Sequence, residues 1–271
     1  MVHRNHLRRL HPQFRHALIA ILFAAVALAG CNHSANESSA PTATVDPATA
    51  GSISGTVTLD GAPPYASGTA SLEGPKPIDM SAAPACVQAN PQPVFPQTIV
   101  TGEKGALANV VVYVKDGLAN YHYDTPTDTA VLQQKNCMYS PHVVALMTGQ
   151  PFEVQNNDPT MHNVHPMPKH NRQWSNSQPS GSAALHETFT HAEFAMPVLC
   201  NVHPWMRSTV FVFDHPYFAV TPREGNFALA NLPPGTYTIE AWHESLGTQD
   251  QTVTIAPHES KAISFTFKSA N

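Results

Sequence analysis

The stretch "PVLCNVHPWMRSTVFVFD", residues 197–214, combines three metal-binding side chains with a strand-like run. Its loop carries Cys200, His203 and Met206 within seven residues. Two histidines, one cysteine and a weakly bound methionine form the blue-copper type of electron-transfer site. The run at residues 208–214 is rich in β-branched and aromatic residues, which favour a strand. The stretch therefore predicts a metal loop next to a strand, with a second histidine supplied from elsewhere in the chain.

Short strands separated by turns dominate the rest of the chain and predict an all-β fold. Strand-like apolar runs punctuated by Gly, Pro or Asp occupy residues 53–61, 107–117, 142–158 and 218–243, and recur near the C-terminus. This spacing is typical of a β-sandwich. Beyond the N-terminal region no apolar period of 3.6 residues persists over three turns, so helix is expected to be minor. Residues 117–133 and 169–187 are expected to be loops.

The N-terminus has the pattern of a secretory signal peptide at residues 1–30. Its start is basic, and the apolar run that follows is too short to span a membrane comfortably. The ending "LAGC" resembles the bacterial lipobox, after which the new N-terminal Cys31 is acylated. An ordinary signal peptide before a chance cysteine is the alternative. The resemblance implies a periplasmic protein, lipid-anchored to a bacterial membrane (the outer membrane is favoured), with a flexible tether at residues 31–50.

The other three cysteines are expected to form one disulfide and leave one thiol. An oxidising compartment favours disulfides, and an odd number leaves one cysteine unpaired. Cys200 has metal-binding neighbours, so it is expected to stay free. A Cys86–Cys137 disulfide is therefore predicted, with two unpaired core cysteines as the alternative.

Composition and motifs argue against two classes of function. The formal net charge is −5, which argues against nucleic acid as a partner. The sequence shows no nucleophile–base pair with plausible spacing and no paired-carboxylate motif, so an enzyme is not expected.

Residues 107–214 resemble the cupredoxins. The segment "VQNNDPTMHNV" is similar to the strand and turn that carry the first copper histidine of plastocyanin-like proteins. The segment "CNVHPWM" followed by "STVFVF" resembles the copper loop and final strand of small bacterial cupredoxins. The resemblance implies a Greek-key β-sandwich in which His162, Cys200, His203 and Met206 bind one type 1 copper ion. Plastocyanin itself has a longer spacing to the methionine.

Other histidines and another metal compete with this assignment. His165 follows His162 by three residues, and residues three apart face opposite sides of a strand, so His162 is preferred. His142 is a candidate for a donor behind the ligands or for a surface residue, and less readily for a ligand. Zinc is the alternative metal, although methionine binds zinc poorly.

A second resemblance is to the carboxypeptidase regulatory-like, or transthyretin-like, domain. The sequence "GNFALANLPPGTY", which begins at Gly225, carries its pattern, and the domain is assigned to residues 215–271. The early "ISGTVTLDGAPP" resembles the first strand of that domain, within an N-terminal segment at residues 51–106. The copper domain would then be inserted into it, and two sequential domains are the alternative. Together the two modules resemble bacterial lipoproteins loosely called methylamine-utilisation proteins.

The resemblances imply electron transfer by a membrane-tethered copper protein that docks to a redox partner in the periplasm. A copper-handling protein without electron transfer is the second hypothesis, favoured by the Met- and His-rich "MHNVHPM". A non-redox module that binds peptide or glycan is the third.

Overall fold

The computed structural model describes residues 44–61, 76–118 and 121–269. The predicted signal peptide and Cys31 lie outside these residues. The expected flexible tether is described only at its end, where residues 44–50 are folded. Here the Thr49 N–H donates to the Asp46 carbonyl oxygen, and the Thr49 carbonyl oxygen accepts from the His258 N–H. The tether therefore ends earlier than residue 50.

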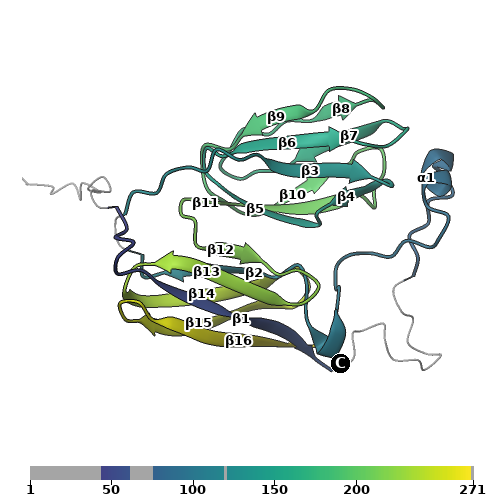
Figure 1. Cartoon of the computed structure of the whole chain (residues 1–271). Coiled ribbons are helices and arrows are strands. Elements are labelled where there is room, and N and C mark those ends of the chain that lie inside the picture. The colour runs from purple at the N-terminus through teal and green to yellow at the C-terminus, as the bar shows by residue number, and fades with distance from the viewer. Residues whose placement is uncertain (1–43, 62–75, 119–120, 270–271) are drawn as a thin grey trace, which may run out of the picture. The chain divides into compact units, whose positions relative to one another are not determined.

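One β-sandwich holds the predicted metal ligands (Figure 1). Its five-stranded sheet has the order β5 (Val143–Met147), β11 (Arg207–Phe213), β10 (Glu193–Leu199), β7 (His162–Pro166) and β8 (Asn176–Gln178). Its four-stranded sheet has the order β4 (Met138–Ser140), β3 (Ala130–Lys135), β6 (Pro151–Asn156) and β9 (Leu185–Thr188). The expected all-β class is confirmed.

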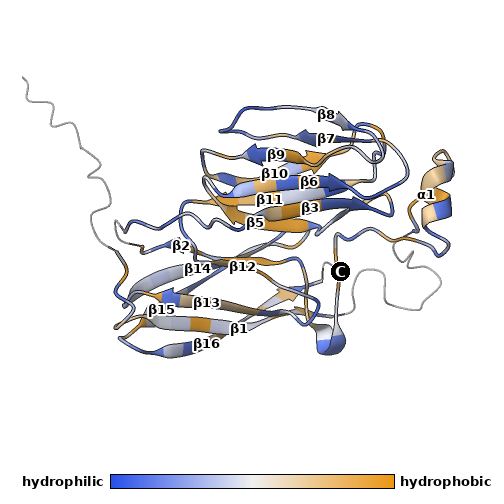
Figure 2. Cartoon of the chain, turned by 45° about the horizontal axis from the view of Figure 1, so that its top comes forward, coloured by the Kyte–Doolittle hydropathy of each residue, from blue (hydrophilic) through white to orange (hydrophobic). Residues whose placement is uncertain are grey.

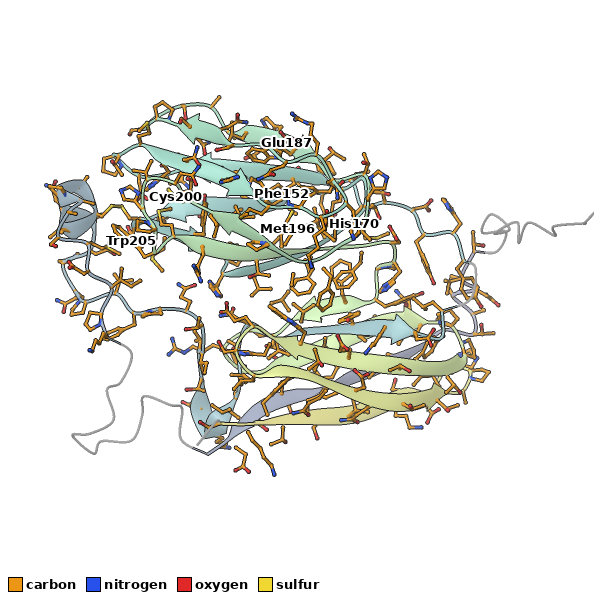
Figure 3. The ribbon with its side chains drawn as sticks, turned by 180° about the vertical axis from the view of Figure 1, so that it is seen from behind. Phe152, His170, Glu187, Met196, Cys200 and Trp205 are labelled. Atoms are coloured by element: carbon orange, nitrogen blue, oxygen red, sulfur yellow. A yellow bond between two sulfur atoms is a disulfide. The ribbon has the colours of Figure 1, made fainter. Side chains whose placement is uncertain are left out.

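The core of this sandwich follows from the two-residue period of its strands. In β6 the alternate residues Phe152 and Val154 are buried, and Met196 of β10 is buried as well. Figure 3 shows Phe152 and Met196 inside the sandwich. In Figure 2 apolar and polar stretches alternate along the strands, as burial of one strand face requires.

Two stretches expected to be loops contain strands. β3 begins within residues 117–133, β8 lies within residues 169–187, and β9 begins within the same range. β3 pairs in parallel with β6, and β9 pairs with the other edge of β6. These strands are short and mostly polar, so their pairing partners stabilise them more than their own hydrophobic pattern does.

A second β-sandwich combines strands from both ends of the described chain. One sheet has the order β13 (Asn226–Leu232), β1 (Gly51–Asp60) and β16 (Ser260–Lys268). The other has the order β12 (Phe218–Val220), β2 (Val111–Asp116), β14 (Gly235–His243) and β15 (Gly247–Ile255). The strands β3–β11 thus separate β1 and β2 from the remaining strands of their own sandwich. This differs from the expected boundary at residue 107, because β2 pairs with β12 and β14 instead of joining the first sandwich.

The chain between β1 and β2 forms two short helices and reaches the first sandwich. It contains a short 3₁₀ helix (Glu103–Gly105) and the helix α1 (Pro84–Ala89), which starts with proline at a position where a missing N–H costs nothing. Met80 and Cys86 from this stretch are buried in the core of the first sandwich. Among the described residues, no helix is long and apolar enough to cross a membrane.

A disulfide joins α1 to the first sandwich. Cys86 of α1 and Cys137, in the turn between β3 and β4, are bonded and fully buried, with a sequence separation of 51 residues. Asn90 reinforces the junction, because its side-chain amide donates to the carbonyl oxygens of Cys86 and Asn136. Of the three cysteines that the structure describes, Cys200 is free.

Removing the disulfide should destabilise the first sandwich. We expect the double variant Cys86→Ala, Cys137→Ala to lose about 4 kcal/mol of unfolding free energy, because the open loop regains chain entropy in the unfolded state. Urea unfolding, followed by tryptophan fluorescence to which Trp174 and Trp205 of the first sandwich contribute, measures the loss. A thiol reductant should lower the wild-type midpoint and leave the variant unchanged. Equal midpoints for reduced and oxidised wild type would contradict this expectation.

Candidate metal centre

Three strand ends bring the predicted ligands to one end of the first sandwich. His162 is the first residue of β7, Cys200 follows the last residue of β10, and Met206 precedes the first residue of β11. The loop between β10 and β11 is closed by its own backbone. The Cys200 N–H donates to the Met206 carbonyl oxygen over 3.2 Å, and the Met206 N–H donates to that of His203 over 3.0 Å. The loop is therefore compact without help from a metal.

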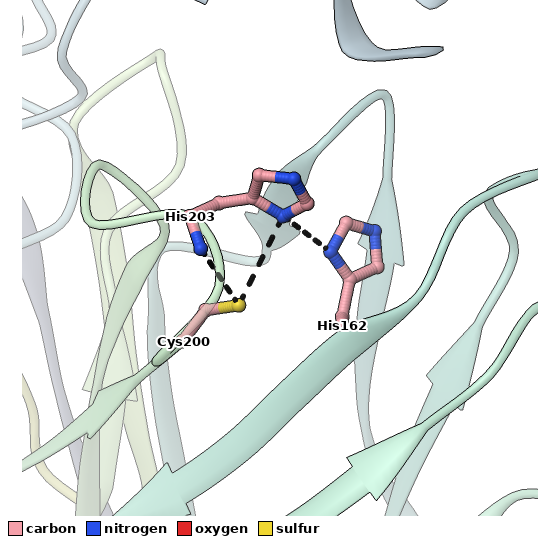
Figure 4. Close-up of side chains that lie close together, drawn as sticks. All are labelled: His162, Cys200 and His203. Carbon is pink, nitrogen blue, oxygen red and sulfur yellow. Dashed lines mark hydrogen bonds between the residues drawn. The ribbon is translucent and has the colours of Figure 1, made fainter. Parts of the chain in front are cut away.

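Two imidazoles and one thiol converge in this region, as Figure 4 shows. Nδ1 of His162 lies 2.9 Å from Nδ1 of His203, and the latter atom lies 4.0 Å from the Cys200 Sγ. One nitrogen from each histidine and the sulfur lie within 4.8 Å of one another. The exposed fractions of the three residues are 0%, 5% and 4% for His162, His203 and Cys200. The arrangement is a buried His₂Cys donor set.

Asp158 fixes the orientation of His162. Its carboxylate is buried and lies 2.8 Å from Nε2 of His162. The same carboxylate accepts hydrogen bonds from the backbone N–H groups of Asn136 and Cys137, over 2.6 and 2.8 Å. Because Nε2 faces a carboxylate, it carries a proton, and Nδ1 is the atom that faces the centre.

Sequence reasoning did not identify Asp158 as part of the site. The only signal was its position in the "NND" turn, four residues before His162. Burial alone would raise the pKa of its carboxyl group, but the hydrogen bonds from His162 and the two backbone N–H groups hold that pKa below the usual value. The side chain is therefore a carboxylate at neutral pH.

The environment of Cys200 favours a thiolate. Burial alone would raise the pKa of the thiol, but His162 and nearby backbone N–H groups lower it overall. Two of these groups, the N–H of Asn163 and that of His203, each lie 3.4 Å from the sulfur. A thiolate is the form that binds metal.

The two histidines have opposite pKa shifts. Burial opposes the charged form of His162, but Asp158 and Cys200 raise its pKa overall. Burial and the neighbouring His162 lower the pKa of His203. Only one proton fits between two Nδ1 atoms 2.9 Å apart, so at least one of these nitrogens presents a lone pair. The donor set fits a single ion that accepts two imidazoles and one thiolate.

The remaining candidates have distinct positions. Met206 is fully buried in the same apolar cluster as Cys200. His165 engages surface amides instead, because its Nδ1 lies 3.1 Å from Asn201 Oδ1 and its Nε2 lies 3.0 Å from Gln173 Nε2. His142 is buried, and its Nε2 lies 2.5 Å from Glu244 Oε1, so the surface position considered for it is wrong.

A second grouping of donors shares residues with the first. Cys137, Asp158 and His162 also place one atom each within 4.8 Å of one another. The Cys137 sulfur is bonded to Cys86, and Nε2 of His162 is hydrogen-bonded to the Asp158 carboxylate. These three residues therefore orient the His162 ring and do not form a separate metal site.

Comparisons with known proteins found similarity in solved structures alone. No family model matches the sequence, and no curated protein matches it. The Cu-containing nitrite reductase (NirK) from Thermus scotoductus SA-01 aligns with a TM-score of 0.30 and 17% identity. The alignment covers 37% of this chain and 26% of that enzyme. A purple cupredoxin from Nitrosopumilus maritimus aligns with a TM-score of 0.26 and 19% identity over 33% of this chain and 99% of its own. A reduced amicyanin variant aligns with a TM-score of 0.28 and 20% identity. The alignment covers 37% of this chain and 97% of the amicyanin chain.

We expect the substitution Asp158→Asn to weaken metal binding by about 10- to 100-fold, because the uncharged amide no longer holds His162 with Nδ1 toward the centre. Competition with a Cu(I) chelator measures the affinity. Glu193→Gln is the matched control, since Glu193 is another buried carboxylate that accepts from backbone N–H groups, those of residues 169–171. An equal loss in both variants would show that Asp158 acts through general stability.

Proposed function

We propose that the first sandwich is a cupredoxin-like domain that binds one copper ion at His162, Cys200 and His203. The observation that carries the proposal is the buried convergence of two Nδ1 atoms and the Cys200 sulfur. Soft thiolate and imidazole donors suit both oxidation states of copper. Zinc accepts the same donors but usually requires a fourth strong ligand in a closed site, and methionine is a poor one.

The proposed role is electron transfer. Copper bound by such donors supplies one-electron chemistry. The contribution of the protein is to hold the donors in place, and three features support this. Asp158 orients His162, backbone bonds close the loop from Cys200 to Met206, and burial excludes water. Donors that are placed in advance need little rearrangement when the charge of the ion changes.

We propose that Met206 would add a weak fourth donor to the ion. Its side chain is buried beside Cys200 in the same apolar cluster, at the residue where the loop enters β11. A thioether at this position binds weakly and tunes the potential more than it holds the ion. Only two residues separate His203 from Met206, and the Met206 N–H donates to the His203 carbonyl oxygen. This hydrogen bond makes the turn tight and keeps the two residues close together.

The setting of the domain is part of the proposal. We propose that Cys31 anchors the chain to a bacterial membrane through lipid, so that the copper domain reaches a redox partner in the periplasm. The second sandwich is proposed to be carboxypeptidase regulatory-like, on the pattern that begins at Gly225. Its buried residues Phe227, Leu229 and Tyr237 are core residues and support no separate activity.

The ligand assignment is tested by optical absorption of the full-length protein, purified in detergent and loaded with Cu(II). We expect wild type to show intense visible thiolate-to-copper charge transfer, and Cys200→Ser to lose it while keeping the fold. His162→Ala should lose the same band, whereas His165→Ala should keep it, since the ring of His165 contacts surface amides. A band retained in Cys200→Ser would overturn the proposed function, and the reverse histidine result would move the ligand to His165.

Substitutions of Met206 should shift the reduction potential in opposite directions. Met206→Leu should keep copper and colour but raise the potential, because loss of a donor disfavours Cu(II) more than Cu(I). Met206→Gln should lower it, because a harder oxygen donor favours Cu(II). Protein-film voltammetry measures both. If both potentials equal that of wild type, Met206 does not coordinate.

A further inference from the structure

The outer edge of His203 is covered by the disulfide. Its Nε2, on the side of the ring away from His162, lies 3.6 Å from the Cys86 Sγ. Cys86 is itself fully buried, and so is its partner Cys137. A redox partner outside the protein therefore cannot contact the His203 edge directly, nor the sulfurs behind it.

The stretch that covers this edge, residues 76–98, is firmly attached. The disulfide holds α1, and the Asn90 side chain donates to the Asn136 carbonyl oxygen over 2.8 Å. The Ile78 N–H donates to the Val94 carbonyl oxygen over 2.8 Å, which closes the stretch on itself. Met80 and Cys86 belong to the core that also holds Cys200 and Met206. We call residues 76–98 the cap.

Trp205 provides a different route to His203. Its ring centroid lies 5.1 Å from that of His203, with 39° between the planes. Its indole N–H donates to the Cys137 carbonyl oxygen over 3.0 Å, which fixes the ring. Figure 3 shows Trp205 near Cys200 at the end of the sandwich that faces α1.

Trp205 also faces a cavity. The ring is only partly buried and lines a cavity of about 230 Å³ together with Ile78, Met138, Pro204 and Arg207. One side of the ring thus contacts a ligand of the metal centre, and the ring reaches a cavity at the boundary between the cap and the loop. The described contacts of His203 place no other aromatic ring in this position, apart from the ligand His162.

We propose that Trp205, and not the His203 edge, is the contact through which the metal centre exchanges electrons with molecules outside the protein. The proposal rests on the proposed copper function. Each exchange moves one electron between the centre and a one-electron partner, and no bond forms or breaks. Electronic coupling falls with the length of the path that an electron must cross. The path from the His203 edge must pass through the fully buried disulfide, whereas Trp205 contacts His203 and is itself partly exposed at a cavity, so it offers the shorter path.

The first test compares Trp205→Leu with Trp205→Phe in the full-length copper-loaded protein. Stopped-flow oxidation of the Cu(I) form by hexacyanoferrate(III) measures the rate, and voltammetry of each variant allows comparison at equal driving force. We expect Trp205→Leu to be slower by about tenfold, a modest change in activation free energy, and Trp205→Phe to stay near wild type because it keeps a ring against His203. Trp242→Leu is the control, because the ring of Trp242 contacts Phe194 and Phe211 and none of the proposed ligands.

The second test removes the cover over His203. We expect Cys86→Ala with Cys137→Ala to restore the rate of the Trp205→Leu variant, because loosening the cap exposes the His203 edge. The metal-free protein gives an independent readout, the alkylation of Cys200 by iodoacetamide followed by peptide mass. Alkylation should be slow in wild type and at least about tenfold faster without the disulfide, as expected when a local opening becomes easier.

The outcomes separate this proposal from the proposed function. Wild type without the charge-transfer band would overturn the copper function and this inference with it. A normal band combined with a wild-type rate in Trp205→Leu would overturn the inference alone. Equally fast alkylation of Cys200 with and without the disulfide would show that the cap does not close the site, which also overturns it. If the disulfide-free variant does not fold, the comparison of Leu with Phe at residue 205 decides.

Discussion

The buried carboxylate of Asp158 is the interaction on which the candidate metal centre depends. It accepts from Nε2 of His162 on one side and from the backbone N–H groups of Asn136 and Cys137 on the other. These two residues form the turn between β3 and β4, and both have positive φ, 56° and 53°. Non-glycine residues rarely adopt this conformation, so the carboxylate offsets its cost by accepting both N–H groups.

This carboxylate couples the centre to the disulfide. The same Cys137 whose N–H meets Asp158 carries the sulfur bonded to Cys86, and Cys86 lies against the outer edge of His203. A path of direct contacts thus runs from Asp158 through Cys137 and Cys86 to His203, while His162 links Asp158 to the same ring from the other side. Each imidazole is contacted at its Nε2 atom, by Asp158 in His162 and by Cys86 in His203. These contacts orient both Nδ1 atoms toward the site without a bound ion. Breaking one contact of a buried charged group leaves its charge poorly compensated, so the site is sensitive to the loss of any partner of the Asp158 carboxylate.

The two sandwiches divide the chain by pairing and not by position in the sequence. β1 and β2 are completed by β12–β16, and the strands between them build the first sandwich. A third apolar cluster combines Val111 and Tyr113 of β2 with Val143, Phe211 and Phe213 of β5 and β11. Phe211 and Trp242 contribute an edge-to-face ring pair, with centroids 4.9 Å apart. Burial of these aromatic side chains stabilises β11, the strand that starts directly after Met206.

The sequence by itself determined the all-β class and the chemistry of the donor set. Short apolar runs between turn residues favour strands, and a thiol, an imidazole and a thioether on one loop favour a site for a soft metal. It also favoured His162 over His165, because residues three apart face opposite sides of a strand. These inferences depend on local periodicity and on side-chain chemistry, which a sequence displays directly.

Only the tertiary structure decided which distant groups meet at the centre. The role of Asp158 depends on a turn 22 residues earlier in the chain, and the cover over His203 depends on Cys86, 117 residues away. The placement of β2 in the second sandwich, and of the polar strands β3, β8 and β9, depends on pairing with distant strands. Local patterns do not encode such pairings, because backbone hydrogen bonds and packing between remote segments supply the free energy that places them.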